Sequence, residues 1–284
     1  MFTRPRTRFD LVPRRVRVHR VEQTSVALRR ITFRDAAPVT PERGLASLQV
    51  PGPEDHVKVF LPDPATGELH APSIAPDGGL QRPTGVVSIS RDYTVRAWRA
   101  LDDGTAEIDV DWVLHGDEGP ASAWAARAAE GDELVLAGPR GSVGVPDGVG
   151  RLTVAVDETG LPAAARWVAA VRAADPAASV TAVVEIGDDV DESFVEAEVD
   201  GATTEILYRT DGPGQLAEAV RSLGGLADDE LFVGAGEAGD LIPVRRYLRR
   251  EAGARADQLA LSGYWRRGVV NLDHHEPLDP TDPD

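Results

Sequence analysis

Three side chains in the run from Ser88 to Arg96 could hold a flat, anionic ligand. Arg91, Tyr93 and Thr94 stand at i, i+2 and i+3 in a stretch that alternates as a β-strand does. Residues two apart on a strand point to the same face, so Arg91 and Tyr93 would share one side. Arg91 could donate to a phosphate, Tyr93 could lie against a ring and Thr94 could hydrogen-bond a ring edge. An exposed strand with a solvated arginine is the other interpretation of this short pattern.

A second candidate lies where a strand is expected to lead into a helix. The strand ends at residues 113–115, and the helix begins at residues 119–122 with Pro120 in its first turn, a position that suits proline. The free N–H groups and the dipole at a helix N-terminus attract phosphate. The segment is therefore a candidate diphosphate site, with a capped surface helix as the alternative.

These two segments resemble those of the siderophore-interacting proteins, a branch of the ferredoxin-reductase-like flavoenzymes that includes NAD(P)H-dependent ferric-siderophore reductases. The similarity is carried by segments in the family's order: His56–Pro62, Arg91–Arg96, Asp111–Gly116, Gly119–Ala125, Gly131–Asp132, Gly138–Ser142, Asp157–Ala163, Ala235–Ala238 and Ser262–Gly268. The resemblance implies that FAD is bound by Arg91, Tyr93, Thr94, Asp111, Val113, Leu114, His115, Gly119, Ala121 and Ser122.

The amino-acid composition excludes several kinds of reactive site and ligand. The sequence has no cysteine, which excludes disulfides, thiolate nucleophiles and cysteine-held zinc or iron–sulfur clusters. Electrons would need another carrier, such as a flavin. The net charge of −17 argues against non-specific binding of nucleic acid, which depends on neutralising phosphates. No run approaches the ~20 apolar residues needed to cross a bilayer, and no signal peptide follows Met1. We expect a cytoplasmic monomer or weak dimer without stable membrane insertion.

The chain is long enough for two domains, and its charge and pattern change near Gly144 to Gly150. Of the net charge, −2 lies in residues 1–145 and −15 in residues 146–284. We expect an antiparallel β-barrel over residues 1–145, which the resemblance makes the FAD-binding domain, and an acidic, disordered tail over 271–284. The expected barrel strands are Arg15–Val21, Ser25–Phe33, His56–Phe60, Gly85–Ser90 and Glu107–Val113.

Residues 146–270 alternate between strands and helices, which is typical of a parallel, Rossmann-like α/β sheet that binds ligands at the carboxyl ends of its strands. Expected strands are Arg151–Val156, Ser179–Ile186, Thr203–Arg209, Glu230–Gly234 and Gln258–Leu261, with helices at Leu161–Ala174, Gly214–Leu223 and Asp240–Glu251. The resemblance makes this the NAD(P)H-binding domain.

The first strand-to-helix turn, residues 157–162, lacks the Gly-x-Gly-x-x-Gly fingerprint. Thr159 and the N–H groups after it could hold a diphosphate, whereas Asp157 and Glu158 suit helix capping or ribose hydroxyls better. A purely structural turn is the alternative, and the resemblance favours the cofactor. The same resemblance and the position of two later strand ends add Gly236, Glu237, Tyr264 and Trp265, the two aromatics as stacking partners or as packing on the sheet.

Two cations are candidates for contact with the substrate. Lys58 is the only lysine and would place a cation near the iron chelate, unless it is an ordinary exposed barrel residue. Arg266 follows the last aromatic pair. No spacing makes His115, His274 or His275 a metal ligand.

Taken with the resemblance, these patterns predict an enzyme that takes a hydride from NADH or NADPH onto FAD and passes single electrons to a ferric siderophore. The alternatives are a general ferric-chelate or flavin reductase and a non-catalytic siderophore-binding protein. NADH and NADPH both stay open. The arginines at 245–246 and 249–250 could bind a 2′-phosphate or form a solvated helix face.

Overall fold

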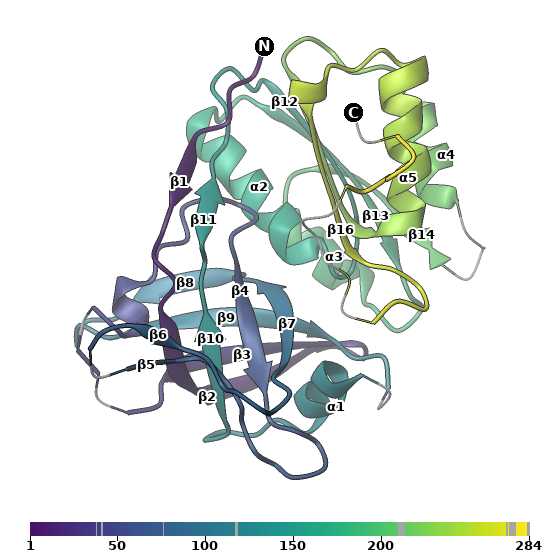
Figure 1. Ribbon diagram of the computed structural model, residues 1–284. Coiled ribbons are helices and arrows are strands. Elements are labelled where there is room, and N and C mark those ends of the chain that lie inside the picture. The colour runs from purple at the N-terminus through teal and green to yellow at the C-terminus, as the bar shows by residue number, and fades with distance from the viewer. Residues whose placement is uncertain are drawn as a thin grey trace. The chain divides into compact units, whose positions relative to one another are not determined.

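The computed structural model describes residues 1–37, 39–40, 42–75, 77–116, 119–209, 214–270, 272 and 277–282, which form two compact units (Figure 1). The barrel unit comprises Arg6–Gly144, and the α/β unit comprises Met1–Pro5 with Val145–Asp284. Within the described residues no helix is long and apolar enough to cross a membrane.

The barrel unit is built on a seven-stranded antiparallel sheet with strand order β7-β4-β10-β2-β3-β9-β8. Two-stranded ribbons, β1 with β11 and β5 with β6, accompany it. The bounds are β1 (Arg6–Arg8), β2 (Pro13–Ser25), β3 (Leu28–Asp35), η1 (Leu45–Ser47), β4 (His56–Leu61), β5 (Ser73–Ile74), β6 (Leu80–Gln81), β7 (Ile89–Thr94), β8 (Ala97–Ala100), β9 (Ala106–Val113), α1 (Pro120–Arg127), β10 (Glu133–Ala137) and β11 (Gly141–Val143).

The barrel core follows from alternation along the strands. Val57, Val59 and Leu61 of β4 are buried, and Ile108 and Val110 of β9 lie in the same apolar cluster. The residues between them point to the other face of the sheet, because successive side chains on a strand alternate. Helix α1 adds two alanines and a tryptophan to this core.

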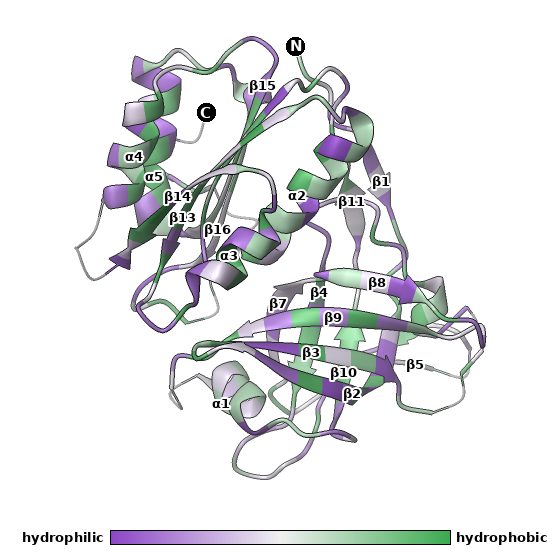
Figure 2. Cartoon of the chain, turned by 180° about the vertical axis from the view of Figure 1, so that it is seen from behind, coloured by the Kyte–Doolittle hydropathy of each residue, from purple (hydrophilic) through white to green (hydrophobic). Residues whose placement is uncertain are grey.

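The α/β unit has a five-stranded parallel sheet with strand order β14-β13-β12-β15-β16. Figures 1 and 2 show α2 and α3 on one face of this sheet and α4 and α5 on the other. In Figure 2 the strands are hydrophobic along much of their length, as expected for a sheet covered on both faces. The bounds are β12 (Arg151–Asp157), α2 (Leu161–Ala174), β13 (Ser179–Ile186), α3 (Glu192–Glu198), β14 (Thr203–Tyr208), α4 (Gln215–Leu223), β15 (Glu230–Glu237), α5 (Ala238–Arg246), η3 (Tyr247–Glu251), η4 (Ala256–Gln258) and β16 (Leu259–Trp265).

Several predicted elements are confirmed, and some bounds were wrong. The helix predicted from Leu161 to Ala174 has those bounds in α2. The strand predicted over Gly85–Ser90 instead runs Ile89–Thr94, because Pro83 and Gly85 precede it in a loop. Strands β8 and β10 and helix α3 were not predicted.

Part of the acidic C-terminal segment is ordered by arginines of α5 and η3. Arg246 pairs with Asp279 at 2.6 Å, and Arg250 pairs with Asp282 at 2.7 Å. The carboxylate of Asp282 also lies 3.2 Å from Arg245. The sequence predicts disorder for this stretch because it is acidic and rich in proline, whereas the basic end of α5 supplies counter-charges for its described residues.

Candidate functional site

Strand β7 places Arg91 and Tyr93 on the inner face of the barrel. The register pairs Tyr93 with Val57 and Arg91 with Val59, both of which are core residues. Directly paired residues of antiparallel strands share a face, so the expected common side of Arg91 and Tyr93 is found. Thr94 ends the strand and is buried.

The ring of Tyr93 lies against a pair of tryptophans whose rings are tilted to one another. Its centroid is 4.1 Å from that of Trp112, which lies 5.1 Å from Trp124 of α1. Burial raises the pKa of the Tyr93 hydroxyl, and the nearby charge of Arg91 opposes that effect. Tyr93 stays neutral and half-buried, so its ring can offer an aromatic surface to a ligand.

The loop that leads from β9 into α1 is closed by Ser122. Its hydroxyl accepts the backbone N–H of His115 at 2.9 Å and donates to the carbonyl of Gly116 at 2.8 Å. Ser122 is almost fully buried, so its side chain fixes the entry to the helix. A Cβ on Gly119 would lie 2.9 Å from the exposed His115 ring, which would have to move to accept it.

The strand-to-helix corner fits the chemistry of a dinucleotide. Helix α1 begins at Pro120 after Gly119, and no side chain among the described residues caps its first N–H groups. Ala121 and Leu114 pack on the core cluster that contains Tyr93. An aromatic surface and a helix N-terminus on one core are what a flavin with a diphosphate requires.

Asp111 and Val113 lie on the other face of β9 from Trp112. Both oxygens of Asp111 accept from Arg30 on the neighbouring strand, each at 2.7 Å. The Asp111 carboxylate therefore serves a cross-strand ion pair. The alternation of β9, in which the buried Val110 and Trp112 alternate with these outward residues, explains the difference in direction.

Lys58 also lies away from the face of Tyr93. It pairs with Asp92 of β7 on the outer side of the sheet, with 2.8 Å between Nζ and the carboxylate. Its side chain is 43% exposed. Lys58 is therefore accessible, but Arg91 and Tyr93 point to the opposite side of the same pair of strands.

In the α/β unit, Asp157 organises the turn between β12 and α2. One carboxylate oxygen accepts from the N–H and the hydroxyl of Thr159, at 2.8 and 2.5 Å, and from the N–H of Gly160 at 3.3 Å. The other accepts from the N–H of Glu237 at 3.0 Å and from the indole of Trp265 at 2.7 Å. Asp157 therefore joins the carboxyl ends of β12, β15 and β16.

Two glycines allow this turn to pack closely against the end of β15. A Cβ on Gly160 would lie 2.5 Å from the carbonyl oxygen of Ala235, so α2 starts directly against β15. Gly236 has a φ of 150°, and a Cβ there would meet the Asp157 carboxylate at 2.6 Å. Among the described residues, no side chain caps the first turn of helix α2. These are the roles that glycines and helix N-termini play in dinucleotide sites.

The predicted residues of β15 and β16 reach the same edge. Glu237 accepts the N–H of Asp240 at 2.8 Å and that of Arg267 at 3.0 Å, which places its carboxylate at the start of α5. Trp265 is tied to Asp157 through its indole. Tyr264 precedes it, and Arg266 begins the turn that closes with Val269.

Two further ionised groups at this edge, Arg209 and Glu185, did not enter the sequence-based site, and Glu158 was considered there only as a helix cap or ribose contact. Arg209, just after β14, donates to both oxygens of Glu158 and lies 3.3 Å from a carboxylate oxygen of Glu185. Burial raises the pKa of Glu185, and hydrogen bonding to Glu158 raises that of Arg209. Burial, together with the Glu158 charge, raises the pKa of Asp157 to about 6. The sequence signal that could have identified these groups was the presence of charged residues at the ends of the expected parallel strands.

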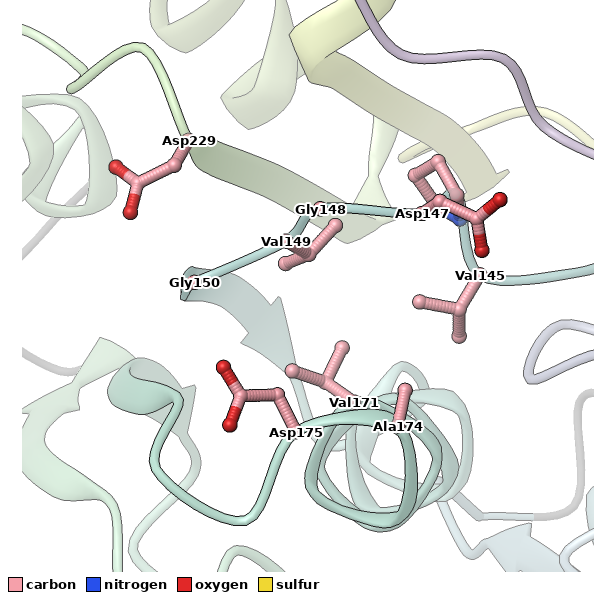
Figure 3. A pocket seen from close by; sticks show the side chains of 10 residues that line it. Val145, Asp147, Gly148, Val149, Gly150, Val171, Ala174, Asp175 and Asp229 are labelled. Atoms are coloured by element: carbon pink, nitrogen blue, oxygen red, sulfur yellow. The ribbon is translucent and has the colours of Figure 1, made fainter.

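A hollow of about 250 Å³ lies at the opposite, amino-end edge of this sheet (Figure 3). It is lined by Val145 to Gly150, the end of α2 and three aspartates, Asp147, Asp175 and Asp229. Carboxylates repel phosphates, so this hollow does not suit a dinucleotide. Among the described residues no group of His, Asp or Glu is arranged to hold a metal ion; His274 and His275 lie outside them.

Two family models match this chain, one over each unit. Residues 17–143 match the Siderophore-interacting FAD-binding domain, and residues 150–268 match the Siderophore-interacting protein family. The NADPH-dependent ferric-chelate reductase of Escherichia coli is 34% identical over 71% of this chain and 74% of its own length. The ferric vibriobactin reductase of Vibrio cholerae is 30% identical over 79% of this chain and 82% of its own.

A solved structure shows the same architecture. The siderophore utilization protein from T. fusca superposes with a TM-score of 0.79 at 33% identity, covering 96% of this chain and all of its own. The sequence matches span most of both units, and the structural match spans nearly the whole fold. The chain therefore belongs to the siderophore-interacting protein family.

Proposed function

We propose that this chain is a flavin-dependent ferric-siderophore reductase that moves electrons from NAD(P)H through FAD to an Fe(III)–siderophore and releases Fe(II). The observation that carries the proposal is the occurrence, on one chain, of an aromatic strand-and-helix corner suited to a flavin and a glycine-lined turn suited to a nicotinamide dinucleotide. The names of the Escherichia coli and Vibrio cholerae relatives support the same reaction.

FAD, when bound, supplies the conversion between the two electrons of a nicotinamide and the single electron that Fe(III) accepts. We assign its binding to Arg91 for a phosphate, Tyr93 for the ring and the first turn of α1 for the diphosphate. Ser122 keeps that turn in place through His115 and Gly116. The side chains of Asp111 and Val113 would act indirectly, by holding β9 in register.

The overall reaction balances with one donor and two acceptors. One NAD(P)H gives two electrons and leaves NAD(P)⁺ and a proton, and two Fe(III) chelates each take one electron. Oxygen chelators hold Fe(II) less tightly than Fe(III), so reduction releases the metal. No side chain has to act as an acid or base in this scheme.

We assign FAD binding to residues 1–145 and NAD(P)H binding to residues 146–270. Asp157 and Thr159 shape the nicotinamide dinucleotide turn, while Gly236, Glu237, Tyr264 and Trp265 complete its edge. Lys58 and Arg266 are the proposed substrate contacts. We place the reaction in the cytoplasm, where NAD(P)H is supplied, and expect a monomer or weak dimer.

Visible absorbance of the purified protein without oxygen tests the proposal. We expect a flavin spectrum that bleaches on addition of NADH or NADPH and recovers when a ferric siderophore is added, with Fe(II) trapped by a coloured chelator. Comparing several ferric chelates and free flavins separates a siderophore reductase from a general ferric-chelate or flavin reductase. A protein that stays colourless after incubation with FAD, yet binds the ferric siderophore, would overturn the proposal.

Replacement of Arg91 by alanine should lower the FAD content of the purified protein at least about tenfold at limiting FAD, because a charge-assisted phosphate contact contributes about 1.5–3 kcal/mol. The ratio of flavin to protein absorbance measures this. The matched control is Arg82→Ala, which removes an exposed arginine and should leave the ratio unchanged. Equal flavin content in both variants would remove Arg91 from the site.

A further inference from the structure

The carboxyl edge of the parallel sheet carries a partly buried triad that the FAD-to-iron reaction does not use. It consists of Glu158, Glu185 and Arg209, from the ends of β12, β13 and β14. Nη1 of Arg209 is 2.8 Å from one oxygen of Glu158, Nη2 donates to the other, and Nε lies 3.3 Å from Glu185. The side chains of Glu158 and Glu185 are 9% and 4% exposed, and that of Arg209 is 24% exposed. Arg209 thus has all three guanidinium nitrogens committed to carboxylates.

The charge of this edge is negative even with Arg209 in place. The triad has two carboxylates for one guanidinium, and Asp157 adjoins it through the chain and by pairing with Glu185 across β12 and β13. On the other side, Glu237 ends β15 and Asp240 lies in the first turn of α5, and the nearest nitrogen of Arg267 to Asp240 is 3.8 Å away. Acids therefore outnumber bases along the described part of this edge.

The position of the triad matters for the adenosine half of a nicotinamide dinucleotide. In open α/β sheets the diphosphate lies at the first strand-to-helix turn, and the adenosine ribose lies towards the end of the next strand. Here the first turn follows β12, and the next strand is β13, which ends in Glu185 and Ile186. An acid at that position accepts from the ribose 2′-hydroxyl of NADH, whereas NADPH requires an available arginine for its 2′-phosphate.

We propose that Glu158, Glu185 and Arg209 make this chain select NADH over NADPH. A 2′-phosphate carries about −1.5 to −2 charge at pH 7 and would have to approach two carboxylates. If it took Arg209 for itself, it would leave Glu158 and Glu185 buried without their counter-ion. Binding of a ribose 2′-hydroxyl brings no negative charge to the carboxylates and does not remove their counter-ion. The hydroxyl can donate to Glu185 while Arg209 stays paired.

Within the described residues, the basic segment that the sequence offered for a 2′-phosphate does not supply the missing cation. The arginine-rich end of α5 and η3 was the sequence-based candidate for a 2′-phosphate. Arg245, Arg246 and Arg250 pair there with Asp279 or Asp282. Helix α5 begins directly after β15 at the carboxyl edge, so its last turn points away from that edge. The Escherichia coli relative is named NADPH-dependent, and the triad predicts that this chain differs from it.

The inference rests on the proposed function, and binding of fragments without the nicotinamide ring tests it separately. Titration calorimetry on the FAD-loaded protein compares ADP-ribose with 2′-phospho-ADP-ribose. We expect ADP-ribose to bind at least about tenfold more tightly, because the additional phosphate meets net negative charge in a partly buried site. Equal binding, or tighter binding of the phosphorylated fragment, would overturn the inference.

Isosteric variants test whether the triad causes the preference for ADP-ribose over its 2′-phosphorylated form. In Glu158→Gln and Glu185→Gln each, the preference for ADP-ribose should fall at least about threefold, because Arg209 gains free charge. The matched control is Glu230→Gln, at the amino end of the same sheet, where Glu230 accepts from Thr153 and Ala227. Its preference should match the wild type. A preference unchanged in both triad variants would mean that other groups select the cofactor and would overturn the assignment.

Flavin bleaching distinguishes failure of the proposed cofactor selectivity from failure of the proposed reductase function. A flavin that bleaches faster with NADPH than with NADH would overturn the selectivity and leave the reductase proposal standing. A flavin that neither dinucleotide bleaches, in a protein that binds neither fragment, would overturn both.

Discussion

Replacement of Asp157 by alanine should lower the free energy of unfolding by about 3 kcal/mol at pH 7, because buried donors left without an acceptor cost about 1–3 kcal/mol each and only some will find water. Asp157 is 4% exposed and accepts from Thr159, Gly160, Glu237 and Trp265. Without it the ends of β12, β15 and β16 lose their common acceptor. Urea denaturation followed by circular dichroism measures the loss.

The pH dependence of that loss has a defined sign. The pKa of Asp157 in the folded protein is raised to about 6, above the value of about 3.9 for an unfolded aspartate. A raised carboxyl pKa contributes stability at low pH that disappears as the pH rises through 6. The deficit of the alanine variant should therefore be larger at pH 5 than at pH 8. Asp147→Ala, at an exposed position, should change stability by less than about 0.5 kcal/mol. If the urea denaturation curve of Asp157→Ala matched that of the wild type, the turn would not depend on this acceptor.

Much of the fold could be predicted because it depends on local patterns. The parallel α/β half was evident from alternating apolar strands and amphipathic helices, and Leu161–Ala174 was correct at both ends. Helix α2 has Pro162 in its first turn and stops before Asp175-Pro176, both of which are strong local signals. Helix α3 has seven residues, acidic at both ends, and its pattern is too short to detect.

The face of the strand on which a side chain lies could be predicted in part from the sequence. Trp112 and Asp111 are adjacent on one strand, so only one of them can face the core, and Asp111 faces outward to Arg30. The same alternation separates Lys58 from Val57 and Val59. Family resemblance groups such neighbours in one motif, although the strand sends them to opposite faces.

The triad could not be predicted, because its members are far apart in sequence. Arg209 follows Glu185 by 24 residues and Glu158 by 51. Which strand lies beside which decides the contact, and the order β14-β13-β12 brings the three ends together. The sequence places each of them near a strand end but carries no sign of their pairing.

Replacement of Arg209 by methionine should destabilise the protein by about 3 kcal/mol at pH 7.5, because removing one partner of a buried ion pair leaves an uncompensated charge. Its guanidinium lowers the pKa of Glu185, which burial already raises. Without Arg209 that pKa rises further. Stability from a group with a raised pKa is present at low pH and lost as the pH rises, so the deficit should grow from pH 5 to pH 7.5. This trend is opposite to that of Asp157→Ala.

Neutralising the partners distinguishes loss of the ion pair from loss of packing. With Glu158→Gln and Glu185→Gln added, Arg209→Met should recover most of the stability at pH 7.5, and its pH dependence should flatten, because no buried charge is left unpaired. The control Arg15→Met breaks a surface pair with Glu133, whose side chains are 63% and 44% exposed, and should cost less than about 1 kcal/mol. A deficit for Arg209→Met that is equal at both pH values and persists with neutral partners would assign Arg209 to packing alone. Recovery would instead show that Arg209 is held by charge, and so is unavailable to a 2′-phosphate unless two glutamates are left without a partner.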